Sequence, residues 1–357
     1  MKKILMVCEA FGGGVFAYVS QLCNDLCDTY DIYLAYSLRP QTPKNYKNIL
    51  NERVKLIEVP NFGDLKKIGK TKKFLRNIEE EIKPDIIHLH SSIAGAIGRL
   101  AFNGKNNKVI YTPHGYAHIL MGKGLKSFVF KFAEWCLGKK NALTLTCCES
   151  EDIEAKKFSK NTFYIETGID IEHFNSVFEN IEQTKNDKFT IFTLGRACNQ
   201  KQPALFNEIA RLVPEADFIW VGNGELESKL TSPNITITGW KPREEALKIA
   251  KSADVFVLCS LGEAIAMSLI ENMYIKKLCI VSNAMGNKSV INDGINGYVC
   301  NEASQYADRI KQAIIEYPTK LVDKAYEDVL NCYNTNLMKR KYIEFYNELV
   351  MRDGRAY

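Results

Sequence analysis

The chain has 357 residues, of which 46% are hydrophobic and 25% are charged, the composition of an ordinary globular protein, and its length favours two domains over one. A net charge of +5 fits an anionic nucleotide or an acidic lipid surface and is too small to indicate nucleic acid. The 11 cysteines form no CxxC pair and no zinc-type cluster with histidine, so we expect reduced thiols in the cytoplasm. No run of roughly 18 apolar residues occurs, and the N-terminus lacks a signal-peptide pattern.

The first half of the chain alternates short apolar runs with amphipathic helical stretches. Helices are predicted over residues 15–27, 64–82 and 127–137, where apolar residues recur at helical spacing. The predicted strands cover residues 4–8, 32–36, 54–59, 86–89, 109–112, 142–146 and 163–166. This alternation predicts a mostly parallel sheet with helices on both faces.

The same alternation restarts after residues 175–188, a polar stretch without periodicity that we interpret as a linker. The strands predicted after it cover residues 189–194, 216–221, 235–237, 255–259 and 279–281. A last helix is predicted over residues 337–350. We expect an α/β protein with two doubly wound, Rossmann-like domains, residues 1–170 and 171–335, facing each other across a cleft. The C-terminal helix, residues 336–357, should cross back to the N-terminal domain. Ligands in such folds bind beyond the carboxyl ends of the strands.

A glycine-rich loop, Gly12 to Gly14, follows the first predicted strand and precedes a helix. Glycine lets the backbone approach a ligand closely, and the first N–H groups of a helix attract an anion. Gly13 and Gly14 are therefore candidate ligand contacts, with a simple tight turn as the alternative. The GxGxxG spacing of dinucleotide-binding loops is absent, which disfavours a nicotinamide cofactor.

The second half places a cationic loop, Gly195-Arg196 to Lys201, directly after a predicted strand. The guanidinium and the ammonium lie five residues apart across a strand-to-helix turn. Both could converge on one diphosphate, the guanidinium as a planar fork and the ammonium as a point charge. On a solvated helix face the same pair would carry no function.

A second loop follows the strand predicted over residues 255–259 and holds Glu263, with Glu271 about two turns into the following helix. The N–H groups of Ile265, Ala266 and Met267 would start that helix and could hold a phosphate. The carboxylates could take sugar and ribose hydroxyls. The alternative is a helix cap at Glu263 and an ordinary surface charge at Glu271.

Two further turns end strands in the same half. One contains Gly222 within Val221 to Leu226, and the other is Thr238-Gly239-Trp240. Such turns could wrap a nucleobase, although turn-forming glycine alone would explain them.

Taken together, these elements resemble the retaining glycosyltransferases of family 4, which have the GT-B fold, and in particular those that build bacterial capsular or surface polysaccharide. Glu263 and Glu271 match the family's E-x7-E motif, and Arg196 and Lys201 match its G-R-x4-K motif. The segments 112–115, 168–174, 221–226 and 293–298 resemble its T-x-H-G segment, N-G-I-D-x3-F hinge, V-G-x-G-x-L turn and D-G-x-N-G loop. The resemblance covers nearly the whole chain.

The chain departs from the family pattern in two places. The usual E-G-F-G stretch reads Glu263-Ala264-Ile265-Ala266, and the G-G-x-x-E segment reads Met285 to Ser289 without its glutamate. The extra methyl groups narrow the pocket around the donor sugar or shift the loop. These departures bear on donor identity more than on reaction class.

The resemblance implies a hexosyltransferase whose donor is a nucleotide-sugar, UDP-linked by family habit. Lys201, Arg196 and the helix start would bind the diphosphate, Glu271 the ribose and Glu263 the transferred sugar. It implies no metal ion or other cofactor, and the sequence has no D-x-D motif. His114 is the expected polar contact of the sugar. His88 and His90 are interpreted as structural or acceptor-side residues, and His118 is a further acceptor candidate.

The resemblance also implies a lipid-diphosphate-linked saccharide acceptor, bound by the first domain. Two basic stretches of that domain could lie on the anionic inner face of the cell membrane, with solvated helix faces as the alternative. One contains Lys66, Lys67, Lys70, Lys72, Lys73 and Arg76 among Leu65, Ile68, Phe74 and Leu75. The other contains Lys123, Lys126, Lys131, Lys139 and Lys140 with Phe128, Phe130, Phe132 and Trp135.

Two other functions fit the same fold. One is an enzyme like the UDP-N-acetylglucosamine 2-epimerases, against which the paired G-R-x4-K and E-x7-E motifs argue. The other is a nucleotide-binding partner of another transferase without activity of its own, which the altered stretch from Glu263 to Ala266 keeps open.

Overall fold

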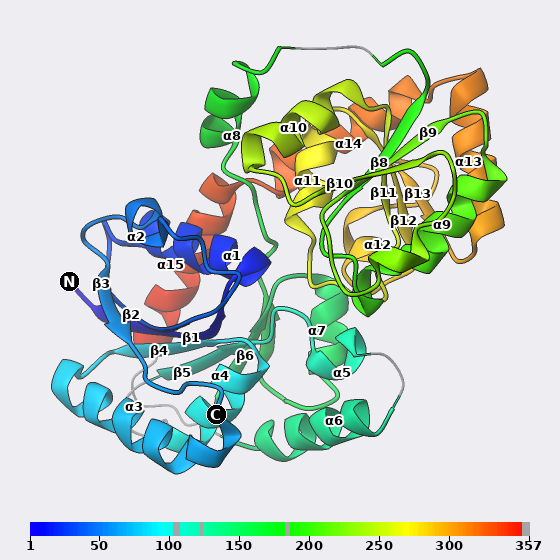
Figure 1. Ribbon diagram of the computed structural model, residues 1–357. Coiled ribbons are helices and arrows are strands. Elements are labelled where there is room, and N and C mark those ends of the chain that lie inside the picture. Colours follow the sequence, from blue (N-terminus) through cyan, green and yellow to red (C-terminus); the bar gives the residue numbers. More distant parts are fainter. Residues whose placement is uncertain (103–107, 122–123, 141, 183–185, 352–357) are drawn as a thin grey trace. The chain divides into compact units, whose positions relative to one another are not determined.

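The computed structural model describes residues 1–102, 108–121, 124–140, 142–182 and 186–351. The chain divides into two compact units (Figure 1). Unit 1 comprises residues 1–118, 123–167 and 336–357, and unit 2 comprises residues 119–122 and 168–335. The main division falls after Thr167, three residues before the boundary predicted after residue 170, and a short segment that begins at Ile119 groups with unit 2.

Unit 1 is built on a parallel sheet of seven strands in the order β3-β2-β1-β4-β5-β6-β7. The strands are β1 (Lys3–Phe11), β2 (Asp31–Leu38), β3 (Lys55–Glu58), β4 (Ile86–His90), β5 (Lys108–Thr112), β6 (Leu143–Thr146) and β7 (Thr162–Tyr164). All seven coincide with predicted strands to within a few residues. Because β1 lies between β2 and β4, the strand order reverses there, and the carboxyl end of β1 is where such sheets bind ligands.

Helices cover both faces of this sheet (Figure 1). The helices of unit 1 are α1 (Gly13–Leu26), α2 (Tyr46–Ile49), α3 (Ile68–Ile82), α4 (Ser92–Ala101), α6 (Leu125–Leu137), α7 (Glu149–Ala155) and α15 (Thr335–Met351), with a 3-10 turn η1 (Leu65–Lys67). The short helix α5 (Ala117–Leu120) begins in unit 1 and ends in the segment that groups with unit 2. On one face α4 packs closely, because Gly95 and Gly98 leave room for Tyr111 and Leu89 of the sheet. A Cβ atom at Gly98 would lie 2.5 Å from the Leu89 side chain.

The C-terminal helix α15 belongs to the other face of unit 1, beside α1 (Figure 1). Its side chains Tyr342 and Tyr346 are fully buried. The Tyr342 hydroxyl lies 2.5 Å from that of Tyr18 in α1, and the Tyr346 hydroxyl lies 2.7 Å from Nδ1 of His88 in β4. The helix predicted over 337–350 is thus present, and it is part of the core of unit 1.

Unit 2 is built on a parallel sheet of six strands in the order β10-β9-β8-β11-β12-β13. The strands are β8 (Thr190–Leu194), β9 (Asp217–Val221), β10 (Ile235–Gly239), β11 (Val255–Leu258), β12 (Leu278–Ser282) and β13 (Tyr298–Cys300). Five were predicted from the sequence, and β13 was missed. The helices are α8 (Ile171–Phe178), α9 (Pro203–Leu212), α10 (Arg243–Ser252), α11 (Met267–Tyr274), α12 (Asn287–Val290), α13 (Ala303–Ile315) and α14 (Thr319–Cys332), with 3-10 turns η2 (Asn199–Lys201) and η3 (Glu227–Lys229).

The linker predicted over residues 175–188 is partly wrong, because α8 continues to Phe178. The Asp170 carboxylate caps this helix by accepting a 2.9 Å hydrogen bond from the His173 N–H. The helix then buries Phe174 in a small cluster with Ile181 and Leu247. An amphipathic helix of two turns is too short to stand out from a polar stretch.

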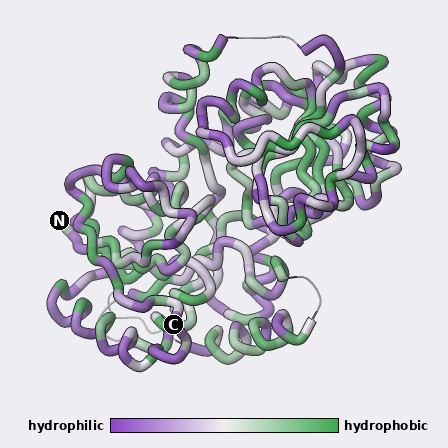
Figure 2. The backbone as a smooth tube through the Cα atoms, viewed as in Figure 1, coloured by the Kyte–Doolittle hydropathy of each residue, from purple (hydrophilic) through white to green (hydrophobic). Residues whose placement is uncertain are grey.

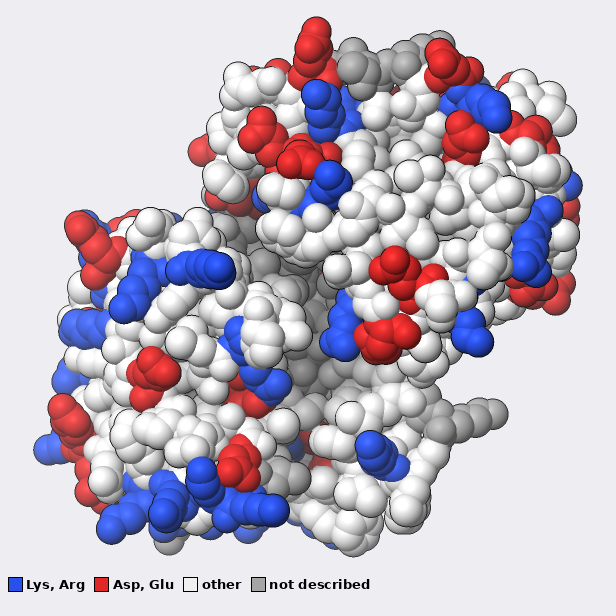
Figure 3. Space-filling model, viewed as in Figure 1, with Lys and Arg blue, Asp and Glu red and all other residues white. Residues whose placement is uncertain are grey.

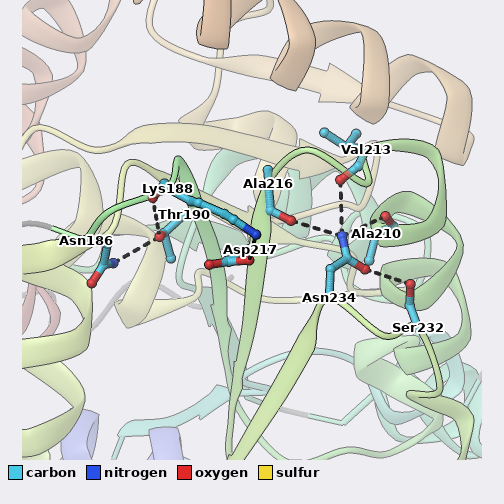
Figure 4. Close-up of polar contacts among 9 residues, drawn as sticks. All are labelled: Asn186, Lys188, Thr190, Ala210, Val213, Ala216, Asp217, Ser232 and Asn234. Atoms are coloured by element: carbon cyan, nitrogen blue, oxygen red, sulfur yellow. Dashed lines mark hydrogen bonds and ion pairs between the residues drawn. The ribbon is translucent and has the colours of Figure 1, made fainter.

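The core of unit 2 lies between its sheet and its helices, where Figure 2 shows the hydrophobic strands enclosed by more polar surface segments. Figure 4 shows a group of hydrogen bonds within unit 2. The Asn234 side-chain amide donates to the carbonyls of Ala210, Val213 and Ala216, at 3.0–3.1 Å. It thereby joins the end of α9 to the strands on either side. The predicted α/β class with two doubly wound, Rossmann-like sheets is confirmed.

Candidate active site

The loop after β8 is held against the turn after β9. Gly195 has a φ of 142° and Gly222 a φ of 138°, and a Cβ atom at Gly222 would lie 2.1 Å from the Gly195 carbonyl oxygen. The Ala197 N–H donates to the Asn223 carbonyl at 3.0 Å, and the Leu226 N–H donates to the Ala197 carbonyl at 2.9 Å. Glycine at 222 is therefore required for the close approach that fixes the loop carrying Arg196.

Lys201 and Glu263, which are 62 residues apart, form an ion pair at the carboxyl ends of β8 and β11. Lys201 Nζ lies 2.6 Å from Glu263 Oε1, and the two side chains are only 18% and 12% exposed. The backbone holds the two loops together as well, since the Leu261 N–H donates to the Gln200 carbonyl at 2.8 Å. The structure thus joins two of the residues that the sequence singled out.

Arg196 takes a different partner. Its Nη2 lies 2.9 Å from Glu225 Oε2, and both side chains are more than half exposed. Arg196 and Lys201 therefore have separate carboxylate partners, rather than facing one common group. An exposed pair of this kind contributes at most about 1 kcal/mol to stability, so an anionic ligand can displace Glu225 at little cost.

Helix α11 begins at Met267, with Ala266 as its N-cap. An alanine methyl group cannot accept a hydrogen bond, so no side-chain cap competes for the first N–H groups of this helix. Glu271 is the fifth residue of α11 and so lies in its second turn, nearer the start than the sequence suggested. It is not an ordinary surface charge, because its Oε1 lies 2.8 Å from Arg243 Nη2 of α10 and its side chain is 12% exposed.

Gly286 packs against the backbone of the stretch from Glu263 to Ala266 and holds it in place. The Gly286 N–H donates to the Glu263 carbonyl at 3.1 Å. A Cβ atom at Gly286 would lie 1.9 Å from the Ala264 carbonyl oxygen, which no side chain could tolerate. The position of the Glu263 carboxylate therefore depends on glycine at 286.

Trp240 follows β10 and is 74% exposed. It comes directly after Gly239, which has a φ of 70° and forms a bridge with Gly222. An exposed indole at the carboxyl edge of this sheet offers a flat apolar surface.

In unit 1 the glycine loop starts α1. Gly13 has a φ of 55°, and neither Gly13 nor Gly14 has a neighbour within 4 Å of a Cβ atom placed there. A methyl side chain at position 14 would therefore meet no neighbouring atom of the protein. Beside this loop lies Glu9, which the sequence analysis did not select. It is 2% exposed and paired with Arg39, and burial raises its pKa while Arg39 opposes the rise.

His114 follows β5 in a left-handed conformation, with a φ of 55°. Its Nε2 lies 2.9 Å from Nδ1 of His90, and its Nδ1 lies 3.5 Å from Cys147 Sγ. Burial of most of the ring lowers the pKa of His114 to about 3. The imidazole is therefore neutral near neutral pH and can share a hydrogen bond, but it supplies no charge.

Glu151, which the sequence analysis also missed, fixes the His114 loop. Its Oε1 accepts from the Gly115 N–H at 2.7 Å and its Oε2 accepts from the Cys147 N–H at 2.9 Å. Burial raises the pKa of this carboxyl to about 7, although the two backbone hydrogen bonds oppose the rise. No motif signals this role, because the contact joins backbone positions far apart in the sequence.

His88, His90 and His118 are buried, and the acceptor contacts suggested for them stay predictions. His88 and His90 are completely buried in β4, and burial lowers the pKa of each. His88 Nε2 lies 2.8 Å from the Thr112 hydroxyl. His118 Nε2 lies 3.3 Å from Glu154, and this contact contributes most to a Glu154 pKa of about 2. Among the residues that the structure describes, no three His, Cys, Asp or Glu side chains gather as metal ligands would.

Two family models together match almost all of the chain. The model of glycosyltransferase family 4 matches residues 12–173, and the model of the group 1 glycosyl transferases matches residues 176–328. The chain belongs to glycosyltransferase family 4. The two matches correspond closely to units 1 and 2, and they assign a transferase rather than an epimerase.

Two relatives of this glycosyltransferase carry names that refer to a lipid-linked saccharide or to a cps gene region. The chain is 28% identical to the UDP-Gal:alpha-D-GlcNAc-diphosphoundecaprenol alpha-1,3-galactosyltransferase of Escherichia coli, over 75% of this chain and 76% of that one. It is 25% identical to a 41.2 kDa protein in the cps region of Klebsiella pneumoniae, over 74% and 79%. The Anabaena protein Alr3699/HepE, solved with UDP and glucose, has a TM-score of 0.78 at 16% identity over 98% and 100%, and thus shares the GT-B fold.

Proposed function

We propose that this glycosyltransferase moves a hexose from a UDP-sugar to a lipid-diphosphate-linked saccharide, with retention of anomeric configuration, in capsule or surface polysaccharide synthesis. The observation that carries the proposal is the Lys201–Glu263 pair beside the uncapped start of α11. A buried cation, a carboxylate and a helix N-terminus together suit a sugar diphosphate. The names of the E. coli and K. pneumoniae relatives support the acceptor and the pathway.

In this proposal the donor is bound by the carboxyl edge of the unit 2 sheet. Lys201 and Arg196 neutralise the diphosphate, and Arg196 leaves its exposed pair with Glu225 to do so. The N–H groups of Ile265, Ala266 and Met267 bind the same phosphates, and Gly195 lets them approach.

The sugar, ribose and base take other contacts. Glu263 accepts from hydroxyls of the transferred sugar, and Glu271 accepts from the ribose hydroxyls. Trp240 and the turn at Gly222 border the base. Gly13 and Gly14 of unit 1 stay predicted donor contacts, and no neighbouring atom lies within 4 Å of a Cβ atom placed at either glycine.

The proposed reaction is a front-side displacement. The acceptor hydroxyl oxygen bonds to the anomeric carbon as the bond from that carbon to the diphosphate oxygen breaks. The hydroxyl proton passes to a diphosphate oxygen, and the bonding electrons leave with the diphosphate. We propose that cationic side chains and the α11 dipole stabilise this leaving group without a metal ion or other cofactor. Neutral His114 stays the predicted polar contact of the sugar, and one of its ring nitrogens would have to leave its present partner for this, Nε2 that of His90 or Nδ1 that of Cys147.

The acceptor is assigned to unit 1. A lipid-linked acceptor confines the enzyme to the cytoplasmic face of the membrane, so we also propose peripheral attachment there. No helix among the described residues is long and apolar enough to span a bilayer.

Thermal-shift measurements with UDP, GDP, dTDP and ADP test the donor half of the proposal. A ligand that binds only the folded state raises the melting temperature, by about 2.7 kcal/mol of stability at a hundred-fold excess over Kd. We expect the largest shift with UDP, and its loss in Lys201→Met. Equal shifts with all four nucleotides, or an unchanged shift in the variant, would contradict the nucleotide assignment.

A further inference from the structure

The outer face of α6 carries a stripe of large apolar side chains. Its members are Leu125, Phe128, Val129, Phe132 and Trp135, which are between 48% and 80% exposed. Spacings of three and four residues place them along one side of the helix. Lys126 and Lys131 fall at the two margins of this apolar stripe, where long side chains can carry their charges away from an apolar phase.

The opposite face of α6 is anchored to the sheet of unit 1. Glu134 is buried there, and its Oε2 lies 2.9 Å from Arg99 Nη2 of α4. Its Oε1 accepts from the Tyr111 hydroxyl at 2.8 Å. A buried charge pair that also makes this hydrogen bond fixes the rotation of α6. The apolar stripe therefore cannot turn inward without breaking that pair.

A groove lined by lysines adjoins the end of α6. It has a volume of about 530 Å³, and its lining includes Lys139, Lys140, Lys156, Lys157, Lys160 and Phe158. Two of these five lysines are paired, Lys156 with Asp152 and Lys157 with Glu154. That leaves three positive charges without a carboxylate partner among the described residues. The Lys139 ammonium lies 3.4 Å from the centre of the Trp135 ring, so the groove and the apolar stripe are continuous.

The basic stretch on α3 differs in this respect. Figure 3 shows Lys and Arg gathered over α3 in that view. No large apolar side chain of α3 is exposed among those described, since Leu75 is buried and Ile68 and Phe74 are partly buried. Lys123, assigned to the other stretch from the sequence, lies outside the described residues. Among the residues that the structure describes in the two candidate surfaces, only those of α6 therefore combine cations with exposed aromatic rings.

We propose that the apolar stripe of α6 enters the acyl layer of an anionic membrane while the lysine groove binds the phosphate of a lipid headgroup. The inference deepens the proposed peripheral attachment and rests on it. The occupant follows from the chemistry of the surface, because a phosphodiester headgroup carries its charge directly above apolar chains. A free phosphate would satisfy the lysines but would leave five apolar side chains in water.

Co-sedimentation of the full chain with vesicles tests the inference and requires no donor or acceptor. A negative result would therefore overturn membrane binding by α6 without bearing on the proposed transfer reaction. We expect binding to vesicles with equal parts of phosphatidylglycerol and phosphatidylcholine, weakened by salt, and little binding to phosphatidylcholine alone. Lys140→Glu with Lys160→Glu should weaken binding by more than ten-fold, since each lysine near an anionic surface is worth roughly five-fold. Excess inorganic phosphate should not release the protein.

Two matched controls sharpen the result. Lys70→Glu with Lys73→Glu makes the same charge change on α3 and should weaken binding far less. Phe128→Ser with Phe132→Ser should abolish binding, whereas Ile315→Ser, at an exposed site in unit 2, should not. A thermal unfolding midpoint close to that of the wild type, measured without ligand, verifies folding of every variant.

Fluorescence reports insertion directly. In a Trp240→Phe background, lipids brominated on their acyl chains should quench Trp135. Any one of four results would overturn the inference. Two concern selectivity: equal loss of binding in the α3 and groove variants, and equal binding to anionic and neutral vesicles. The other two are release of the protein by inorganic phosphate and an unquenched Trp135.

Discussion

Replacing Glu151 with glutamine should change how the stability of unit 1 depends on pH. Burial raises the pKa of Glu151 to about 7 in the folded protein, against an ordinary value of 4.5 for an unfolded chain. A carboxyl with a raised folded pKa stabilises the protein fully below the unfolded pKa, and that contribution is lost as the pH rises through the folded pKa. The Glu151→Gln variant lacks this titration.

The size of the effect follows from the shift. A difference of roughly 2.5 pKa units, at 1.36 kcal/mol each, gives about 3 kcal/mol. The free energy of unfolding of the wild type minus that of the variant should therefore fall by about this amount between about pH 4.5 and pH 8. A constant offset of about 1–3 kcal/mol is added, because glutamine cannot accept from both the Gly115 and Cys147 N–H groups.

Urea unfolding across this pH range, followed by hydrogen exchange in peptides of unit 1, measures the difference. Other titrations, such as that of Glu154 with its pKa of about 2, are common to both proteins and cancel. A difference that stays constant with pH to within about 1 kcal/mol would refute the reasoning, since the burial of Glu151 would then carry no protonation cost. The variant should also loosen the loop of His114, which faster exchange at Gly115 would report.

Three further changes address the donor site. Arg196→Ala should lower kcat/KM by about 10²–10³, a loss of about 3–4 kcal/mol of transition-state stabilisation. The unfolding midpoint should stay nearly unchanged, because the pair of Arg196 with Glu225 is exposed. A large loss of stability would contradict this expectation. Gly286→Ala should displace the Glu263 loop, because the new Cβ atom would lie 1.9 Å from the Ala264 carbonyl oxygen; kinetics like those of the wild type would show that the loop position is unimportant. Glu271→Gln should raise KM for a ribonucleotide donor more than for its 2′-deoxy analogue, and equal changes would exclude a ribose contact.

Part of the candidate site could be predicted because its residues directly follow predicted strands. Lys201 and Glu263 each follow a predicted strand, and neighbouring parallel strands bring their carboxyl ends to the same edge. The strand order brings the two loops to the same edge of the sheet, whereas the ion pair between Lys201 and Glu263 was not predicted. The sequence did not predict that Glu225 pairs with Arg196 or that Arg243 pairs with Glu271. Glu225 and Arg243 are both exposed, and an exposed charged side chain can pair with many different neighbours.

Contacts between distant segments could not be read from the sequence. Glu151 lies in a polar helical turn, and nothing in that turn indicates an N–H group from a loop 36 residues earlier. The strand β13 has only three residues next to a glycine turn, too short for a period-two pattern to emerge. The exposed aromatic rings of α6 were visible as residues, but their direction depends on the buried pair of Glu134 with Arg99.

The most direct test of the proposed function is a transfer assay with purified protein. UDP-hexoses are supplied with an undecaprenyl-diphosphate-linked saccharide, product is detected by mass spectrometry, and the new anomeric linkage is assigned by NMR. We predict one UDP-hexose whose α-linkage is retained in the product, with activity abolished in Lys201→Met. An inverted linkage, or no transfer from any UDP-hexose by a protein that still shows the UDP-induced thermal shift, would contradict the account.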